Sequence, residues 1–406
     1  MSGVITKCIS SITLCIVAVV TSHDGTLLTD RGPAATVRPA RVFLLIGQLG
    51  LGGAEKQVVL LARGLRARGV DTTVLVMFAG GPREDALRAA GVPVVHLGFR
   101  RRTAGWGMLP SALMAFFRLV GHLRRMRPDV LHAFLIHSYV VAAPAARLAG
   151  VPVLVAGRRS LGDFKQGRRL VLALERAATR ATDHLIANAE AVAADARRQE
   201  GFAQDKITVV YNGLPDSAFD LAPPAVLATD LPVVLCVANF RPYKGHWYLL
   251  DAIARLRAEA LPCTLVLVGD GPGRTDLEQF AERLGLDVRF LGVRTDVEKL
   301  LARADAVVLA SLHEGMSNAV MEAMAAGLPI VATEVGGTGE LLRGRGVLVP
   351  PADPGALADG LERVLTDPAF AEDLGRRARS WSQAHLRVDS MVDQHIRIYR
   401  DLLERR

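Results

Sequence analysis

The stretch at residues 311–340, SLHEGMSNAVMEAMAAGLPIVATEVGGTGE, decides the fold of the second half of the chain. It follows an apolar run at residues 306–310 that is typical of a buried strand in a parallel sheet. A short polar loop comes next, and then a helical segment that Ser317 or Asn318 can cap and that Gly327 ends. Such a joint predicts an anion site, because the first N–H groups of a helix have no partner within the helix.

Two carboxylates flank this joint. Glu314 lies in the loop and Glu322 lies one turn into the expected helix, with seven residues between them. A lone glutamate on a helix usually lies on a solvated face, but a pair placed around such a joint favours a cleft. A second glycine turn at residues 336–339 opens another helix at Glu340, and turns after neighbouring strands meet at the carboxyl edge of a sheet.

The pattern Glu314, seven residues, Glu322, and then AMAAGLPIVATEVGG resembles the donor-site signature of the retaining GT-B glycosyltransferases. It most resembles glycosyltransferase family 4. Two further motifs of that family occur in the expected order, the glycine loop GLGGAEK at residues 50–56 and the Lys-Gly pair in NFRPYKGH at residues 239–246. The resemblance covers roughly residues 41–404, so it concerns nearly the whole chain.

The fold class that we expect is α/β. Apolar runs alternate with helical segments along most of the chain, which indicates parallel βαβ units. Expected strands, besides one after Arg41, lie at residues 72–77, 92–97, 130–134, 151–156, 184–187, 207–210, 233–238, 264–268, 288–291, 306–310, 330–332 and 347–349. The resemblance implies two tandem Rossmann-like domains, the GT-B fold, with a donor cleft between them and a C-terminal helix that crosses back to the first domain.

The expected domain boundaries follow breaks in this pattern. Residues 1–40 form an apolar or disordered tail, because the apolar run at residues 8–20 is shorter than the roughly 20 residues of a membrane span and no convincing cleavage site follows it. The remaining parts are an acceptor domain at residues 41–215, a linker at 216–230, a nucleotide-sugar donor domain at 231–385 and the crossover helix at 386–406.

Charge and cysteine content narrow the possible partners. The net charge is +8, and its excess clusters in arginine pairs before residue 231, but no nucleic-acid-binding module or interleaved aromatic pattern accompanies them. Residues 106–127, with Arg118, Arg124, Arg125 and Arg127 and with Arg101 and Arg102 just upstream, suit an interfacial helix on an anionic membrane, although its apolar face must also cover a sheet. The four cysteines lack metal or redox spacing. We expect a cytoplasmic protein, peripheral on the inner face of the cytoplasmic membrane.

Lys244 is the residue that we expect to stabilise the leaving group. Only six of the 49 basic residues are lysines, so a lysine inside a motif carries weight. Charge builds on the departing phosphate during glycosyl transfer, and Lys244 followed by Gly245 can meet it. The family commonly has an arginine where this chain has Asn239, and Arg241 is the candidate replacement.

The resemblance implies roles for the other site residues. Glu322 holds the ribose hydroxyls, Glu314 faces the donor sugar, and backbone groups near Val293 meet the base. His137 touches the transferred sugar, with His132 as the alternative, since Phe134 stands where a second histidine is common. The remaining expected donor-binding residues are Gly52, Gly53, Gly315, Met316 and Ser317.

The expected reaction is transfer of a sugar from a UDP- or GDP-linked donor to a hydroxyl of a glycan or lipid-linked acceptor, with retention of configuration. The chain contains no Asp-x-Asp pair, so we expect no metal, and we expect no cofactor. Two alternatives stay open. A nucleotide-sugar epimerase of the same fold requires extra acid–base carboxylates, and a catalytically silent GT-B binding subunit would not need Glu314, Glu322, Lys244 and Gly53.

Overall fold

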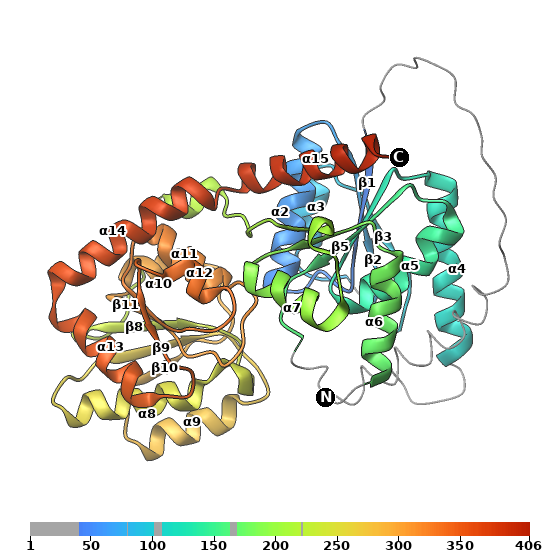
Figure 1. Cartoon of the computed structure of the whole chain (residues 1–406). Helices are drawn as coiled ribbons and strands as arrows, with labels where there is room; N and C mark the ends of the chain where they lie inside the picture. The colour runs from blue at the N-terminus through green and yellow to red at the C-terminus, as the bar shows by residue number, and fades with distance from the viewer. Residues whose placement is uncertain (1–39, 79, 101–107, 163–168, 221) are drawn as a thin grey trace. The chain divides into compact units, whose positions relative to one another are not determined.

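The computed structural model describes residues 40–78, 80–100, 108–162, 169–220 and 222–406. The expected tail at residues 1–40 and the residues Trp106, Arg101 and Arg102 therefore lie outside the described residues, except for residue 40. The chain divides into two compact units (Figure 1). The first contains the chain up to Asn188, Val192–Val210 and Met391–Arg406, and the second contains Ala189–Ala191 and Tyr211–Ser390.

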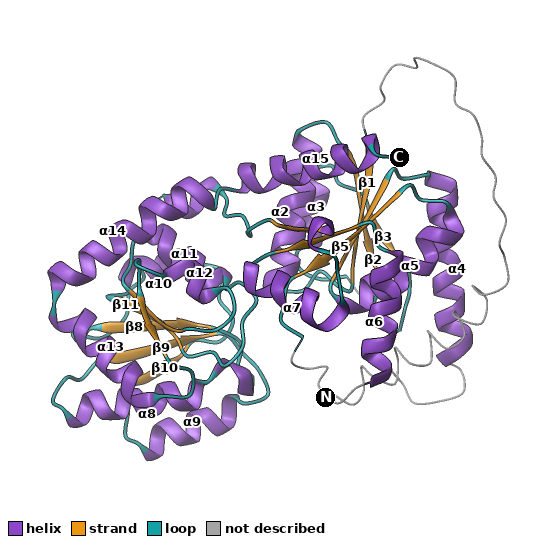
Figure 2. Cartoon of the chain, viewed as in Figure 1, coloured by secondary structure: helices purple, strands orange, loops and turns teal. Residues whose placement is uncertain are grey.

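The first unit is built around a parallel sheet of seven strands in the order β3-β2-β1-β4-β5-β6-β7. Helices flank this sheet (Figure 2). Its elements are β1 (Arg41–Ile46), α2 (Gly53–Ala67), β2 (Asp71–Val76), α3 (Glu84–Ala89), β3 (Val94–His96), α4 (Met108–Met126), β4 (Val130–Phe134), α5 (Ile136–Ala149), β5 (Val153–Arg158), α6 (Arg169–Ala181), β6 (His184–Ala187), α7 (Glu190–Glu200), β7 (Ile207–Val209) and α15 (Val388–Glu404).

The second unit contains a parallel sheet of six strands in the order β10-β9-β8-β11-β12-β13. Its elements are β8 (Val233–Val237), η4 (Pro242–Lys244), α8 (His246–Ala258), β9 (Thr264–Val268), α9 (Arg274–Arg283), β10 (Val288–Phe290), α10 (Val297–Arg303), β11 (Ala306–Leu309), α11 (Asn318–Ala326), β12 (Ile330–Thr333), α12 (Thr338–Leu342), β13 (Val347–Val349), α13 (Pro354–Thr366) and α14 (Pro368–His385). Two Rossmann-like α/β units confirm the predicted fold class.

The expected strands are all present, and their ends differ from the prediction by at most two residues. The largest shift is at β5, which was expected at residues 151–156. Val151 instead donates its N–H to Ala146 O at 3.0 Å and completes the end of α5. The helix expected to open at Glu340 already begins at Thr338, directly after the glycine pair.

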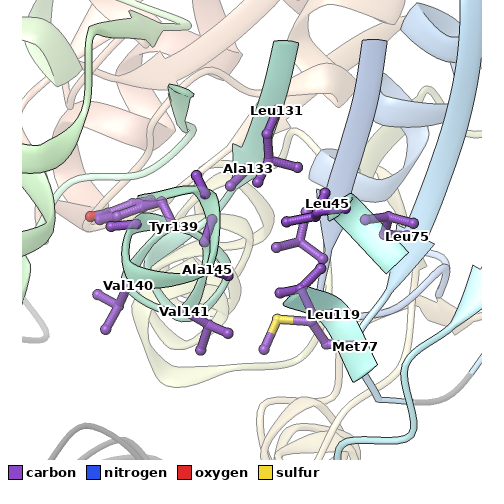
Figure 3. Close-up of a cluster of buried hydrophobic side chains, with 14 of the residues drawn as sticks. Leu45, Leu75, Met77, Leu119, Leu131, Ala133, Tyr139, Val140, Val141 and Ala145 are labelled. Atoms are coloured by element: carbon purple, nitrogen blue, oxygen red, sulfur yellow. The ribbon is translucent and has the colours of Figure 1, made fainter. Parts of the chain in front are cut away.

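The core of the first unit lies between its sheet and the helices α4 and α5. Alternate residues of β1 and β4, such as Leu45 and Leu131, belong to one cluster with Leu119 of α4 and Tyr139 of α5, and all four side chains are buried (Figure 3). Because successive strand residues point to opposite faces, this pattern leaves the other face of the sheet for different helices.

The C-terminal helix α15 packs on that other face. Residues from Met391 onward belong to the first unit, whereas α14 belongs to the second. His132 of β4 and Tyr399 of α15 form a buried hydrogen bond of 2.7 Å between Nδ1 and the phenol oxygen. Residues 211–215, expected in the first domain, belong to the second unit, where Leu214 bonds to the backbone of Leu386 and Val388.

Candidate functional site

In each unit the order of the strands reverses at one point of the sheet. It reverses between β1 and β4 in the first unit and between β8 and β11 in the second. In open α/β sheets, ligands bind at the carboxyl ends of the strands at this switch point. Lys244 follows β8 and Glu314 follows β11, whereas the glycine loop follows β1 and His137 follows β4. The predicted residues therefore mark the switch points of both sheets.

A close backbone approach brings the Lys244 loop against the end of β11. Gly245 has a φ of +67°, and a Cβ atom at this position would lie 1.9 Å from the carbonyl oxygen of Ala310. Leu312 also donates its N–H to Tyr243 O at 2.8 Å. Glycine is therefore required after Lys244, both for its conformation and for the contact.

Lys244 and Glu314 form an ion pair across these loops. The ammonium group of Lys244 donates to Glu314 Oε1, and the two side chains are only 15% and 9% exposed. The Ser311 hydroxyl donates to the same oxygen at 2.8 Å. A charged pair with so little solvent around it is held in one geometry and offers both a cation and a carboxylate at the switch point.

The loop between β11 and α11 is fixed from both ends. Ser317 caps α11, since its hydroxyl accepts the N–H of Val320 at 3.4 Å, and Gly327 ends the helix in the left-handed conformation, as predicted. Gly315, Met316 and Ser317 are buried. Glu322 lies half-buried in the middle of α11.

The glycine pair after β12 closes over this loop. A Cβ atom on Gly336 would lie 1.8 Å from Glu314 O, and one on Gly337 would lie 2.4 Å from Gly315 O. Gly337 also donates its N–H to Gly315 O at 2.8 Å. This second glycine turn thus allows the backbone that carries Glu314 to approach closely.

A glycine loop that the sequence analysis did not single out supports the Lys244 loop. It spans residues 269–273, GDGPG, directly after β9. A Cβ atom on Gly269 would lie 2.1 Å from Ala238 O, and one on Gly271 would lie 2.6 Å from Phe240 O. The signal that could have identified it is the density of glycines at the end of a predicted strand.

The remaining predicted residues of the second unit lie at the same edge but farther apart. Asn239 and Arg241 are exposed on the loop after β8. Val293 is 55% exposed after β10, and β9 separates that strand from β8. The structure therefore joins Lys244 directly to Glu314, whereas Val293 belongs to a more distant loop.

In the first unit, His137 lies against the start of the loop after β1. Its Nε2 atom is 2.4 Å from where a Cβ atom on Gly47 would lie, and its ring is 5.8 Å from the ring of Phe78. Leu135, two residues earlier, has a φ of +70° and a ψ of +155°, a region that is essentially reserved for glycine. Such strain is typical of functional loops and supports a role for the segment that carries His137.

Gly52 and Gly53 begin helix α2, with Gly52 as its N-cap. A Cβ atom on Gly52 would lie 2.3 Å from Glu55 Oε2, so a larger residue at this position would have to displace the Glu55 carboxylate. Arg83 fixes the preceding residues, because its Nε and Nη2 atoms donate to the carbonyl oxygens of Gly50 and Leu51 at 3.1 and 3.3 Å.

His132, the alternative to His137, is a core residue. Its side chain is fully buried and bonded to Tyr399. Burial, followed by the neighbouring His395 and Arg159, holds the pKa of His132 well below its usual value. A fully buried imidazole has no surface to offer a sugar, so His132 does not suit this contact, and the role of His137 stays a prediction.

Helix α4 has both the buried apolar face and the exposed face that the sequence suggested. Phe116, Leu119 and Leu123 are buried, whereas Met114 and Phe117 are 63% and 51% exposed. Among the arginines, Arg118 donates to Leu97 O and Arg124 donates to Leu148 O. These two bonds satisfy backbone carbonyl oxygens of neighbouring segments. Arg125 and Arg127 are exposed.

None of the described helices combines the length and the apolar character that a membrane span requires. Within the described ranges, no three His, Cys, Asp or Glu side chains are grouped as metal ligands would be. Metal independence stays a prediction.

Two Rossmann-like units, with glycine turns and a Lys–Glu pair at their switch points, define the class of GT-B glycosyltransferases. Residues 52–213 match the family described as glycosyl transferase 4-like domain, and residues 231–367 match glycosyl transferases group 1. The chain belongs to the group 1 glycosyltransferases of family 4, a retaining family that uses nucleotide-sugar donors.

Characterised relatives agree with this assignment. Glycogen synthase of Mycobacterium tuberculosis is 32% identical over 361 residues, which are 81% of this chain and 86% of that protein. The lipopolysaccharide core biosynthesis glycosyltransferase LpsE of Rhizobium meliloti is 28% identical over 360 residues, 86% of this chain and 95% of that protein. The crystal structure of Anabaena HepE in complex with UDP and glucose has a TM-score of 0.76 at 25% identity, with 88% of this chain and 98% of that chain covered.

Proposed function

We propose that this glycosyltransferase moves a hexose-type sugar from a UDP- or GDP-linked donor to a hydroxyl of a lipid-linked or cell-envelope glycan, without a metal ion. The observation that carries the proposal is the partly buried Lys244–Glu314 pair at the switch point of the second sheet. It supplies a cation where the leaving diphosphate needs one and a carboxylate where sugar hydroxyls need an acceptor.

Lys244 stabilises the nucleoside diphosphate as it leaves. The negative charge on its phosphates grows in the transition state, and a fixed cation in a nearly dry site acts more strongly there than in water. The N–H groups at the start of α11, behind the Ser317 cap, face the same edge and add the positive end of a helix dipole.

The two carboxylates bind different parts of the donor. Glu322 accepts from the vicinal ribose hydroxyls, because an ionised carboxylate has acceptor sites for both. Glu314, nearer to Lys244, accepts from hydroxyls of the transferred sugar. In the first unit, His137 contacts that sugar, and the amides of Gly52 and Gly53 meet the diphosphate. Asn239, Arg241 and the backbone at Val293 complete the donor site.

The relatives support the choice of acceptor. LpsE and a second relative, LpsD of the same organism at 27% identity, are glycosyltransferases of lipopolysaccharide core biosynthesis. Incubation of the protein with radiolabelled donor and bacterial lipid extract should yield label in the organic phase. Label found only in water-soluble glycans would overturn the lipid-linked acceptor and leave the donor chemistry standing.

The exposed side of α4 supports contact with an anionic membrane, and with it a location on the cytoplasmic face. Met114 and Phe117 add apolar surface, and Arg125 adds a charge worth about 1 kcal/mol near anionic lipid. The variant Met114→Ser/Phe117→Ser should sediment less with phosphatidylglycerol vesicles than wild type. The control Val226→Ser removes an apolar side chain that is 99% exposed elsewhere. Equal sedimentation of all three proteins would refute the membrane contact.

Release of nucleoside diphosphate from UDP-glucose, UDP-N-acetylglucosamine and GDP-mannose tests the reaction itself. A retaining glycosyltransferase releases the diphosphate and keeps the anomeric configuration in its product. An epimerase would change the sugar in the donor by inverting a ring carbon, and a silent binding subunit would release nothing.

A further inference from the structure

We propose that Ser311 is a positioning residue for this reaction and that it holds Glu314 in place when Lys244 engages the donor. The inference rests on the proposed roles of Lys244 and Glu314. Its basis is that one oxygen of Glu314 accepts hydrogen bonds from both Lys244 and Ser311.

Ser311 is more rigid than either partner of the ion pair. It is fully buried at the end of β11. Its carbonyl oxygen accepts the hydroxyl of Thr333 on the neighbouring strand β12 at 2.5 Å, and Thr333 is fully buried as well. The next residue, Leu312, bonds to the backbone of Tyr243 in the loop that carries Lys244. The Ser311 hydroxyl therefore projects from a backbone that is held by strand β12 and by the loop that carries Lys244.

The two donors to Glu314 Oε1 differ in how they respond to a ligand. Lys244 is a flexible ammonium with three N–H donors, and an entering diphosphate competes with Glu314 for it. The same diphosphate repels the Glu314 carboxylate, because both are negatively charged. A hydroxyl held at 2.8 Å by a rigid strand end keeps its hydrogen bond and prevents the carboxylate from swinging away.

The variant Ser311→Ala removes this hydroxyl without leaving a large cavity. Turnover of UDP-glucose hydrolysis should fall about tenfold, the scale of one hydrogen bond to a charged acceptor, while the donor KM changes less than about twofold. The matched control is Ser382→Ala. Ser382 is also fully buried, and its hydroxyl donates to a backbone carbonyl of α14, Arg379 O, at 2.9 Å. The control should keep wild-type turnover.

A double-mutant cycle separates positioning from a purely structural effect. In the Glu314→Ala background, measured at higher enzyme concentration, adding Ser311→Ala should lower turnover no further, because the group that Ser311 positions is gone. A second tenfold loss in that background would overturn the inference, as would wild-type turnover of Ser311→Ala. Failure of the proposed function looks different: wild-type protein would release no diphosphate, or Glu314→Ala would hydrolyse donor as fast as wild type.

Discussion

Replacing Lys244 by alanine should lower both the free energy of unfolding and kcat, through two separable effects. The stability effect arises because Glu314, only 9% exposed, loses its counter-ion and keeps Ser311 as a donor. Removing one partner of a buried pair costs about 3–5 kcal/mol. Because some solvent reaches Glu314 and its hydrogen bond to Ser311 persists, we expect a loss of about 3 kcal/mol in the free energy of unfolding. For a unit of roughly 180 residues, that lowers its unfolding temperature by about 6–12 °C.

The effect on turnover arises from the transition state. Loss of one preorganised electrostatic contact lowers kcat by about 10²–10³-fold, or roughly 3–4 kcal/mol. The second substitution Glu314→Gln removes the uncompensated charge, so the double variant Lys244→Ala/Glu314→Gln should unfold within about 2 °C of wild type, where 2–4 °C correspond to about 1 kcal/mol. Its kcat should stay at least about 10²-fold below that of wild type.

Scanning calorimetry and a coupled assay of diphosphate release measure the two effects on the same samples. Arg343→Ala is the matched control, since it breaks an ion pair with Glu334 whose side chains are 78% and 51% exposed. That loss should stay below about 1 kcal/mol. If the double variant unfolded at the temperature of Lys244→Ala, the ion pair would not be the source of the stability. If Lys244→Ala kept wild-type kcat, Lys244 would not act on the leaving group.

Four further outcomes are expected. Glu322→Gln should weaken nucleoside diphosphate binding in isothermal titration, whereas Glu314→Gln should mainly lower kcat; the reverse result would exchange their roles. Gly47→Ala should push His137 aside and lower turnover at least about tenfold with unchanged nucleotide affinity, by the scale of one misplaced contact; unchanged turnover would remove His137 from the site. EDTA should leave the initial rate unchanged, and a rate abolished by EDTA and restored by Mg²⁺ would show that the reaction needs a metal. Burial, helped by Lys244, lowers the pKa of His246 from 6.5 to about 4, so stability present above pH 6.5 should be lost as the pH falls towards 4. The variant His246→Leu should lose less stability than wild type between pH 6.5 and 4. Equal losses in the two proteins would show that His246 is not the source of this pH dependence.

The sequence was sufficient to predict the local parts of the candidate site. A strand, a polar loop, a Ser cap and a terminating glycine place Glu314 and Glu322 on either side of a helix start, and the structure shows this joint at α11. These features depend on neighbours within a few residues, and their conformational rules are local. The alternation of apolar runs with helical segments likewise predicted the two sheets. A strand that is buried on both faces consists of consecutive apolar residues, so it can be recognised from its own sequence.

Contacts between distant segments could not be predicted in the same way. The pair of Lys244 and Glu314 depends on the approach of Gly245 to Ala310, which only the register of β8 beside β11 decides. His132 lies within β4 and His137 follows that strand. His132 is held in the core by a hydrogen bond to Tyr399, a residue of the last helix. No local pattern reports a partner 267 positions away.

The most direct test of the account is diphosphate release from a panel of nucleotide sugars by wild-type protein and by Lys244→Ala. The account predicts that wild-type protein releases UDP or GDP from at least one donor and that Lys244→Ala releases it about 10²–10³-fold more slowly. Equal rates for the two proteins, or no release from any donor, would contradict a leaving-group site built on the Lys244–Glu314 pair.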